Sequence, residues 1–404
     1  MTKAALFRFV AQPGEIARGV RRLGLKGAVL HGVRRTGAAL ERALLGPCQL
    51  RINPMGAVCN HTCPMCWLQQ LDPEEKKRQF KADRAEGLTL AEYVALFDGM
   101  PPGLTEVNVV GGGEPLVHPD CVGIMREIKR RGWRGYLITN GTLMHEPVAE
   151  ALLDMGWDLT RVSTHAGDRE TYRVVQGVDH FEALRSRLTA FTRLRRERGK
   201  ADQCALHVHH VLQRENIETI PAMFEFSEEV GADHVVFEIV FAFDPATLLR
   251  PAELARAAEL LSDCAARAKV SSNAAEIVGQ LAREQGEHAA ARDAAVPDDG
   301  VPARPARNGR GQPGAAADEA PEGSAPYRPA NRCSVGFDSS FITSRGDVLP
   351  CCFADETMGN VRERSFREIW NGARYVAFRK RLINGCFAGY CSRFRCKMTS
   401  FLHD

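Results

Sequence analysis

The chain has 404 residues, of which 44% are hydrophobic and 25% are charged, and its net charge is +3. This composition is that of an ordinary folded protein with room for two or three domains, and it excludes a largely disordered chain. No run of about 18 or more apolar residues and no apolar signal segment is found, so we expect neither a membrane span nor secretion. The 13 cysteines are therefore expected in the reducing cytoplasm, where thiols serve metal binding or catalysis more than disulfides.

The first 51 residues are strongly basic, with ten Lys or Arg against two Glu, a local balance of +8. Ile16, Val20 and Leu23 recur at a helical period. We interpret residues 1–49 as a basic helical extension. It packs on the main domain with a solvated basic face, or it docks on an anionic partner or membrane surface. We expect no nucleic-acid partner.

Short β-rich runs alternate with helical stretches from residue 50 to 245. The five runs are 105–115, 135–142, 159–167, 204–212 and 233–241. This alternation predicts an α/β fold with a parallel sheet, either a barrel or a doubly wound sheet. The runs end in Gly, Asn, Ser or His, and parallel α/β folds carry their functional groups at the carboxyl ends of the strands.

The rest of the chain divides into three segments. Residues 246–283 are helical in pattern. Residues 284–330 are rich in Ala, Pro and Gly without periodicity, which predicts a flexible linker. Residues 331–404 form a compact segment with six cysteines, namely Cys333, Cys351, Cys352, Cys386, Cys391 and Cys396.

The first chemical motif is GAVCNHTCPMCW, which places Cys59, Cys63 and Cys66 within eight positions. Tetrahedral zinc would need a fourth protein ligand, and His61 is the near candidate. An iron–sulfur cluster held by three thiolates would instead keep one iron open for an exogenous ligand. The spacing by itself leaves both interpretations open.

The second motif is VVGGGEPLVHP, with Gly112, Gly113, Glu114 and Pro115 at the end of the next strand. Glycines at a strand end let the backbone approach a ligand closely, and the Glu114 carboxylate can accept a hydrogen bond from an ammonium group.

Cys-x3-Cys-x2-Cys followed about 50 residues later by Gly-Gly-Glu-Pro resembles the radical S-adenosylmethionine (SAM) superfamily. The resemblance implies a partial (β/α)6 barrel over residues 50–245 and a [4Fe–4S] cluster on the three cysteines. In that family the fourth iron binds SAM. Reduction by a donor such as flavodoxin or ferredoxin then yields a 5′-deoxyadenosyl radical that abstracts hydrogen from the substrate. The resemblance also implies a set of residues that contact SAM, namely Gly112, Gly113, Glu114, Pro115, Asn140 in TNGT and Ser163 in VSTHAG.

The cysteine-rich segment is similar to the SPASM or Twitch extension of radical SAM enzymes. Gly346 stands five positions before Cys351, and a GN…S…EIW stretch follows. This resemblance implies one auxiliary [4Fe–4S] cluster, with two clusters as an alternative. The expected ligands are four of the set Cys333, Cys351, Cys386, Cys391 and Cys396. Cys352 is then a packed thiol, and a zinc ribbon is the rival interpretation of the segment.

The run HVHHVL adds three histidines on a predicted strand. Alternation puts His207 and His209 on one face and His210 on the other. We interpret them as hydrogen-bonded barrel residues, with substrate contact or proton transfer as the alternative. Among the isolated cysteines, Cys204 is the candidate hydrogen donor if the reaction is an epimerisation.

These motifs predict an enzyme that abstracts a hydrogen atom from a substrate C–H bond. Our leading hypothesis is oxidation or epimerisation of a polar small metabolite of the sugar or aminocyclitol type. Modification of a ribosomally made peptide or a protein side chain is the first alternative. A non-enzymatic protein whose cysteines only hold structural metal is the second.

Overall fold

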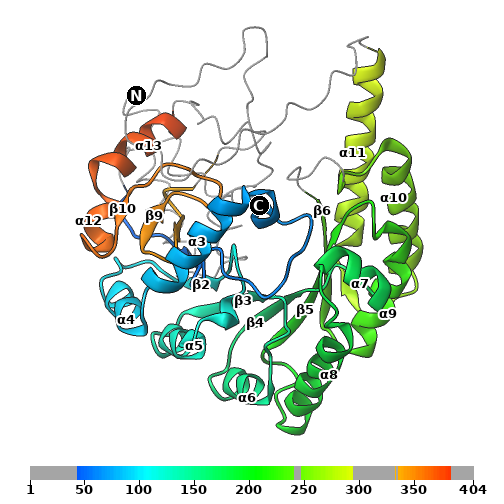
Figure 1. Cartoon of the computed structure of the whole chain (residues 1–404), viewed down its shortest axis with the longest axis horizontal. Coiled ribbons are helices and arrows are strands. Elements are labelled where there is room, and N and C mark those ends of the chain that lie inside the picture. The colour runs from blue at the N-terminus through cyan, green and yellow to red at the C-terminus, as the bar shows by residue number, and fades with distance from the viewer. Residues whose placement is uncertain (1–42, 241–246, 294–332, 334, 384–404) are drawn as a thin grey trace, which may run out of the picture.

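The computed structural model describes residues 43–240, 247–293, 333 and 335–383 (Figure 1). In this part of the chain the strands are β1 (Gln49–Ile52), β2 (Glu106–Val109), β3 (Arg134–Thr139), β4 (Leu159–Ser163), β5 (Ala205–Leu212), β6 (His234–Ile239), β7 (Ser271–Ser272), β8 (Ser339–Ile342), β9 (Asp347–Leu349) and β10 (Gly359–Asn360). The α-helices are α3 (Pro73–Glu86), α4 (Leu90–Asp98), α5 (Cys121–Arg130), α6 (Glu146–Asp154), α7 (Arg169–Gln176), α8 (Phe181–Glu197), α9 (Ile220–Glu229), α10 (Pro251–Ala265), α11 (Ala274–Asp293), α12 (Phe366–Trp370) and α13 (Ala373–Ile383).

The strands form one sheet in the order β10-β9-β8-β1-β2-β3-β4-β5-β6-β7. From β1 to β6 each strand pairs in parallel with the next one in the chain. Helices α4, α5, α6 and α8 lie along the outer side of the curved sheet (Figure 1). The expected α/β fold with a parallel sheet is confirmed, and the five predicted β-rich runs coincide with β2 to β6.

Alternate strand residues build the layer between sheet and helices. Leu50 and Ile52 on β1 and Val107 and Val109 on β2 are fully buried in the main apolar cluster, together with residues of α4 and α5. Their neighbours in sequence point to the opposite face, because successive side chains of a strand alternate. We call this opposite face, turned away from the helices, the inner face of the sheet.

Local sequence signals fix the helix ends near the site. Asp72 caps α3 by accepting hydrogen bonds from the backbone N–H groups of the first turn. Thr89 and Glu92 form a reciprocal capping box at the start of α4. Helix α7 ends at Gly177 in the left-handed conformation (φ +68°), where a Cβ would meet Thr62 Oγ1 at 2.5 Å. This end of α7 therefore packs directly on the loop after β1.

The C-terminal segment continues the same sheet. Strand β8 pairs in parallel with β1, with Leu50 opposite Ser340, and β9 returns antiparallel to β8. Helices α12 and α13 follow. A compact C-terminal segment was expected from the sequence, but its pairing with β1 was not.

Several expectations fall outside the described residues. These are most of the N-terminal extension, the linker from residue 294 onward, and Cys386, Cys391 and Cys396. Helix α11 continues to Asp293, beyond residue 284 where the linker was expected to begin. Among the helices that the structure describes, none is long and apolar enough to cross a membrane.

Candidate active site

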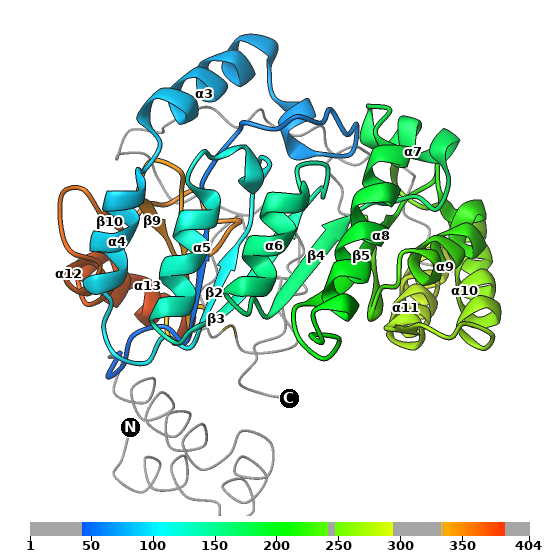
Figure 2. The same cartoon turned by 90° about the horizontal axis from the view of Figure 1, so that it is seen from below.

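The three motif cysteines lie on the loop after β1, which we call the cluster loop (residues 53–66). Cys59, Cys63 and Cys66 are half-buried free thiols. The backbone N–H of Cys66 donates to Cys63 O at 2.9 Å, so the last two cysteines flank a tight turn. Figure 2 shows this loop and α3 beyond the carboxyl ends of the sheet strands.

The thiols share a desolvated environment. Burial, together with the smaller effects of the nearby charges of Glu114 and Cys66, raises the pKa of Cys59 to about 11. Burial also raises the pKa of Cys63 and of Cys66. Because thiolates are the metal-binding form, a bound metal would displace these protons.

The surroundings of the cysteines fit an iron–sulfur cluster better than zinc. His61 Nδ1 lies 3.1 Å from Gln176 Oε1, and burial lowers the pKa of His61 to about 4. In the described ranges, no three His, Cys, Asp or Glu side chains converge as a single metal ion requires. Zinc would need its ligands about 2.3 Å away. Three thiolates without a fourth protein ligand suit a multi-iron cluster with one open position.

Gln176, at the end of α7, ties the cluster loop to β4. Its Oε1 accepts from Cys63 Sγ at 2.9 Å, and its Nε2 donates to the carbonyls of Ser163 (2.9 Å) and Thr164 (2.7 Å). The residue is 1% exposed. Sequence reasoning missed it, because a buried Gln on a helix shows no pattern that reveals its partners.

The glycines after β2 fit tightly against the cluster loop. A Cβ on Gly113 would meet Val58 O at 2.0 Å, and one on Gly112 would meet the Trp67 ring at 2.7 Å. The backbone N–H of Glu114 donates to Val58 O at 2.9 Å. These glycines are therefore required to seat the cysteine-bearing loop against the sheet.

Glu114 is a buried carboxylate that holds the end of β3. It accepts from Thr139 Oγ1 at 2.6 Å, from the Asn140 N–H at 2.7 Å and from the Leu116 N–H at 3.0 Å. Burial raises the pKa of Glu114, against the lowering effect of these bonds. Pro115 begins the short 3-10 helix Pro115–Val117.

The other predicted SAM contacts lie at the same edge. Asn140 Nδ2 donates to Asn60 Oδ1 on the cluster loop at 2.7 Å, and Asn60 Nδ2 donates to Thr142 Oγ1 at 2.9 Å. Ser163 is the last residue of β4, opposite His209. The structure thus gathers the cysteines, the glycine motif, Asn140 and Ser163 at the carboxyl ends of β1 to β4.

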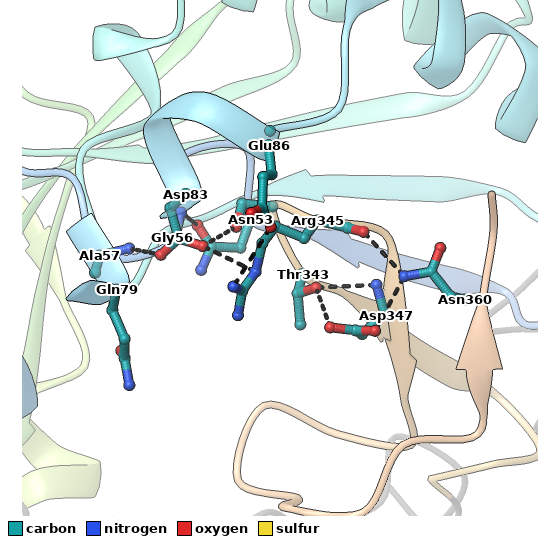
Figure 3. Close-up of polar contacts among 12 residues, drawn as sticks. Asn53, Gly56, Ala57, Gln79, Asp83, Glu86, Thr343, Arg345, Asp347 and Asn360 are labelled. Carbon is teal, nitrogen blue, oxygen red and sulfur yellow. Dashed lines mark hydrogen bonds and ion pairs between the residues drawn. The ribbon is translucent and has the colours of Figure 1, made fainter. Parts of the chain in front are cut away.

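A polar network joins the cluster loop to the C-terminal segment (Figure 3). Asp83 on α3 accepts from the Ala57 N–H and from Ser344 Oγ, both at 2.8 Å. Its Oδ1 also lies 3.4 Å from Arg345 Nε. Asn53 Oδ1 accepts from the Gly56 N–H at 2.9 Å. Asp83 was another residue missed from the sequence.

The described part of the auxiliary segment places two expected ligands. Cys333 and Cys351 pack against the main apolar cluster. Gly346, before Cys351, occupies the β8–β9 turn with φ +84°. Cys352 was expected as a packed thiol, yet its Sγ accepts a long hydrogen bond (3.8 Å) from Arg51 Nη1. Arg51 belongs to the inner face, so Cys352 is directed there.

Charged and polar side chains on the inner face include Arg51, Arg161, His209 and Glu238. Their sequence neighbours are buried towards the helices, namely Leu50, Ile52, Thr160, Val162, Val208 and Phe237. Glu238 lies 3.6 Å from both Arg161 Nη1 and His209 Nε2. Burial works to raise the pKa of Glu238, but His209, Arg161 and Arg51 outweigh it, and the pKa is lowered.

The remaining candidates lie elsewhere. Cys204 precedes β5, at the amino end of the strand, and its Sγ donates to Leu152 O of α6 at 3.5 Å. It lies in the helix-side core at 3% exposure, a position that does not favour hydrogen donation to a substrate. His210 stacks on Phe237 towards the helices, whereas His209 faces inward, as alternation predicted. His165 Nδ1 accepts from the Val211 N–H at 3.0 Å.

Two protein families match the chain. The sequence model of the radical SAM superfamily matches residues 53–227, and that of the SPASM iron–sulfur cluster-binding domain matches residues 333–397. Both ranges agree with the resemblances inferred from the motifs.

Similar proteins include the AdoMet-dependent heme synthase of Methanosarcina barkeri, 27% identical over 68% of this chain and 70% of that protein. The PqqA peptide cyclase of Gluconobacter oxydans is 30% identical over 44% of this chain. This chain spans about half the length of that cyclase (47%).

Solved structures share the fold. Streptococcus suis SuiB bound to S-adenosylmethionine aligns with a TM-score of 0.56 at 15% identity, over 94% of this chain and 76% of SuiB. Native anSMEcpe with bound AdoMet aligns with a TM-score of 0.53 at 16% identity, over 87% of each chain. The chain therefore belongs to the radical SAM superfamily, as an enzyme that binds a [4Fe–4S] cluster and SAM and carries a SPASM domain for auxiliary iron–sulfur binding.

Proposed function

We propose that this radical SAM enzyme oxidises or epimerises a polar small metabolite of the sugar or aminocyclitol type at an unactivated C–H bond. When bound, the cluster and SAM supply a carbon radical that removes a hydrogen atom. The protein's own residues hold the substrate and exclude water. Because the chain belongs to a superfamily of enzymes, the alternative of a purely structural metal-binding protein has no support.

The polar inner face of the sheet carries this proposal. Barrel interiors of parallel α/β proteins are usually filled with branched apolar side chains. Here inward positions are occupied by Arg51, Arg161, His209 and Glu238. The Glu238 side chain is 44% exposed. Polar groups in such a place are costly unless they are hydrogen-bonded, so they favour a substrate rich in hydroxyl or amino groups.

The position of these residues agrees with hydrogen abstraction near SAM. His209 lies opposite Ser163, an expected SAM contact, in the β4–β5 register. A substrate held by His209 and Glu238 would therefore lie near the carboxyl ends of the strands, where the cluster loop and Ser163 also lie. The Glu238–His209 pair can hold or move a proton from a substrate hydroxyl.

Peptide maturation is the second candidate, because related proteins act on or bind peptides. The PqqA peptide cyclase is a sequence relative, and SuiB has a solved structure with its precursor peptide SuiA. The same inward charges could bind a polar peptide side chain.

The two candidates are separated by the source of the abstracted hydrogen. Anaerobically reconstituted protein is incubated with SAM, dithionite and one of two fractions of deuterium-labelled cell extract, either small metabolites or peptides. The proposal expects deuterium in 5′-deoxyadenosine from the metabolite fraction. Deuterium from the peptide fraction alone would reject it in favour of peptide maturation.

The proposal includes a cytoplasmic location, where the cysteines stay reduced, and an electron donor such as flavodoxin or ferredoxin. The electron donor is tested by replacing dithionite with flavodoxin or ferredoxin, each with its reductase, and measuring the rate of SAM cleavage.

A further inference from the structure

The inner-face side chains Arg51, Arg161, His209 and Glu238 act as one group although they come from four strands. Arg161 on β4 reaches Glu238 on β6 across the intervening β5, at 3.6 Å. The charge of Arg51 on β1 also acts on Glu238. Side chains from strands this far apart can meet because this face of the curved sheet is concave (Figure 1).

This group leaves polar atoms without partners. The two contacts of Glu238, with Arg161 and His209, are both 3.6 Å and so longer than good hydrogen bonds. His209 is 7% exposed, and neither ring nitrogen has a hydrogen bond to a described residue. Asn108 on β2 is 8% exposed, and its Oδ1 has no partner among the described residues either. Buried polar atoms are rarely left this way, which points to an absent polar ligand.

Within the group, the guanidinium of Arg51 has no carboxylate of its own in the part of the chain that the structure describes. Arg51 donates through Nε to Gln49 Oε1 (3.3 Å) and through Nη1 to Cys352 Sγ, and in the described ranges it has no ion pair. Two guanidinium groups thus face the single carboxylate of Glu238. The other inward carboxylate nearby, Glu106, accepts from Gln49 Nε2 at 2.7 Å.

We propose that the substrate is a hydroxylated carboxylic acid, whose carboxylate binds Arg51 and Arg161 and whose hydroxyl groups bind Glu238 and His209. The guanidinium group is the side chain best suited to a planar carboxylate, which it can bind through two parallel hydrogen bonds. This inference rests on the proposed function, because it names the substrate class of the same site.

The test measures binding to the reconstituted holoenzyme with SAM present, without reductant, by isothermal titration calorimetry. D-glucuronate and D-glucose form a matched pair that differs in the carboxylate. We expect D-glucuronate to bind at least tenfold more tightly than D-glucose. If both sugars bind with equal affinity, or if D-glucose 6-phosphate binds more tightly than D-glucuronate, the carboxylate assignment is overturned.

Variants identify the residues. Arg51→Gln is expected to weaken D-glucuronate binding at least tenfold, whereas Arg51→Lys, which keeps the charge, retains most of it. Arg134→Gln is the matched control, because Arg134 begins β3 at the amino end and stacks on Tyr136. Iron content and SAM affinity of each variant report whether it is folded. Wild-type affinity in a folded Arg51→Gln protein would contradict the proposal.

Binding of two peptides, Gly-Glu-Gly and Gly-Gln-Gly, distinguishes a failure of this inference from a failure of the proposed function. If Gly-Glu-Gly binds and Gly-Gln-Gly and D-glucuronate do not, the substrate is an acidic peptide. The carboxylate site then stands, while the metabolite proposal fails.

Discussion

Asp83 of α3 and Ser344 of the β8–β9 turn share a hydrogen bond of 2.8 Å although they lie 261 positions apart in the chain. The other carboxylate oxygen of Asp83 accepts from the N–H of Ala57, two positions before the first cluster cysteine. The SPASM segment and the cluster loop are therefore held by opposite oxygens of one buried side chain. A displacement of the SPASM segment is therefore expected to displace the cluster loop as well.

Asp83→Ala is predicted to destabilise the protein by about 2–4 kcal/mol, because it leaves the buried Ala57 N–H and Ser344 hydroxyl without their acceptor. Chemical denaturation measures the change. Glu86→Ala is the control, since Glu86 is more exposed and lies 3.8 Å from the same Arg345. Equal effects of the two variants would mean that Asp83 acts only as a surface charge.

Gln176→Leu is predicted to lower the iron content of the reconstituted protein by up to about four atoms per chain, the content of one [4Fe–4S] cluster. Leucine keeps the side-chain volume but loses the bonds to His61 of the cluster loop and to the carbonyls of Ser163 and Thr164. Iron and sulfide analysis measures the loss. Val174→Ala, at an exposed site on the same helix, should retain wild-type iron. Full iron in Gln176→Leu would show that this amide does not support the cluster loop.

Gly113→Ala is predicted to abolish SAM cleavage, because the added Cβ would stand 2.0 Å from Val58 O and push the cluster loop away from β2. The measurement is 5′-deoxyadenosine formation after reconstitution. Gly286→Ala in α11 adds the same group in open space and is expected to be neutral or slightly stabilising. Normal turnover by Gly113→Ala would refute the tight seating of the loop.

Glu92 gives a prediction about pH. Its hydrogen bond with Arg362 lowers the pKa of Glu92 to about 2. The lowered pKa means that this pair stabilises the fold above about pH 4.5 and that the contribution is lost as the pH falls towards 2. Glu92→Gln keeps a side chain suited to the capping box but removes the charge. The difference in melting temperature between wild type and variant should be larger at pH 7 than at pH 3; no change with pH would contradict it.

The sequence was sufficient for the parallel strands β2 to β6 and for most cluster-loop and strand-end residues. Period-two alternation and the two motifs predicted β2 to β6 and the gathering of Cys59, Gly113 and Asn140 at one edge. The same alternation puts Cys204 with Leu206 and Val208 on the helix side, so the candidate hydrogen donor could have been assigned away from the inner face.

The remaining features depend on pairings between distant segments. Strand β8 is four residues long and carries no local signal that it pairs with β1, about 290 positions earlier. Gln176 and Asp83 are polar residues on amphipathic helices, and their importance follows only from which loops the folded chain brings to them.

The most direct test of the account is hydrogen transfer to 5′-deoxyadenosine. Reconstituted protein, SAM and dithionite are combined with the anionic small-metabolite fraction from the source organism grown in deuterium oxide. The 5′-deoxyadenosine is then analysed by mass spectrometry. We expect a one-deuterium increase in the mass of 5′-deoxyadenosine, and we expect it to disappear in Cys63→Ala. Unlabelled 5′-deoxyadenosine from protein with full iron and sulfide, together with labelled product from the peptide fraction, would contradict it.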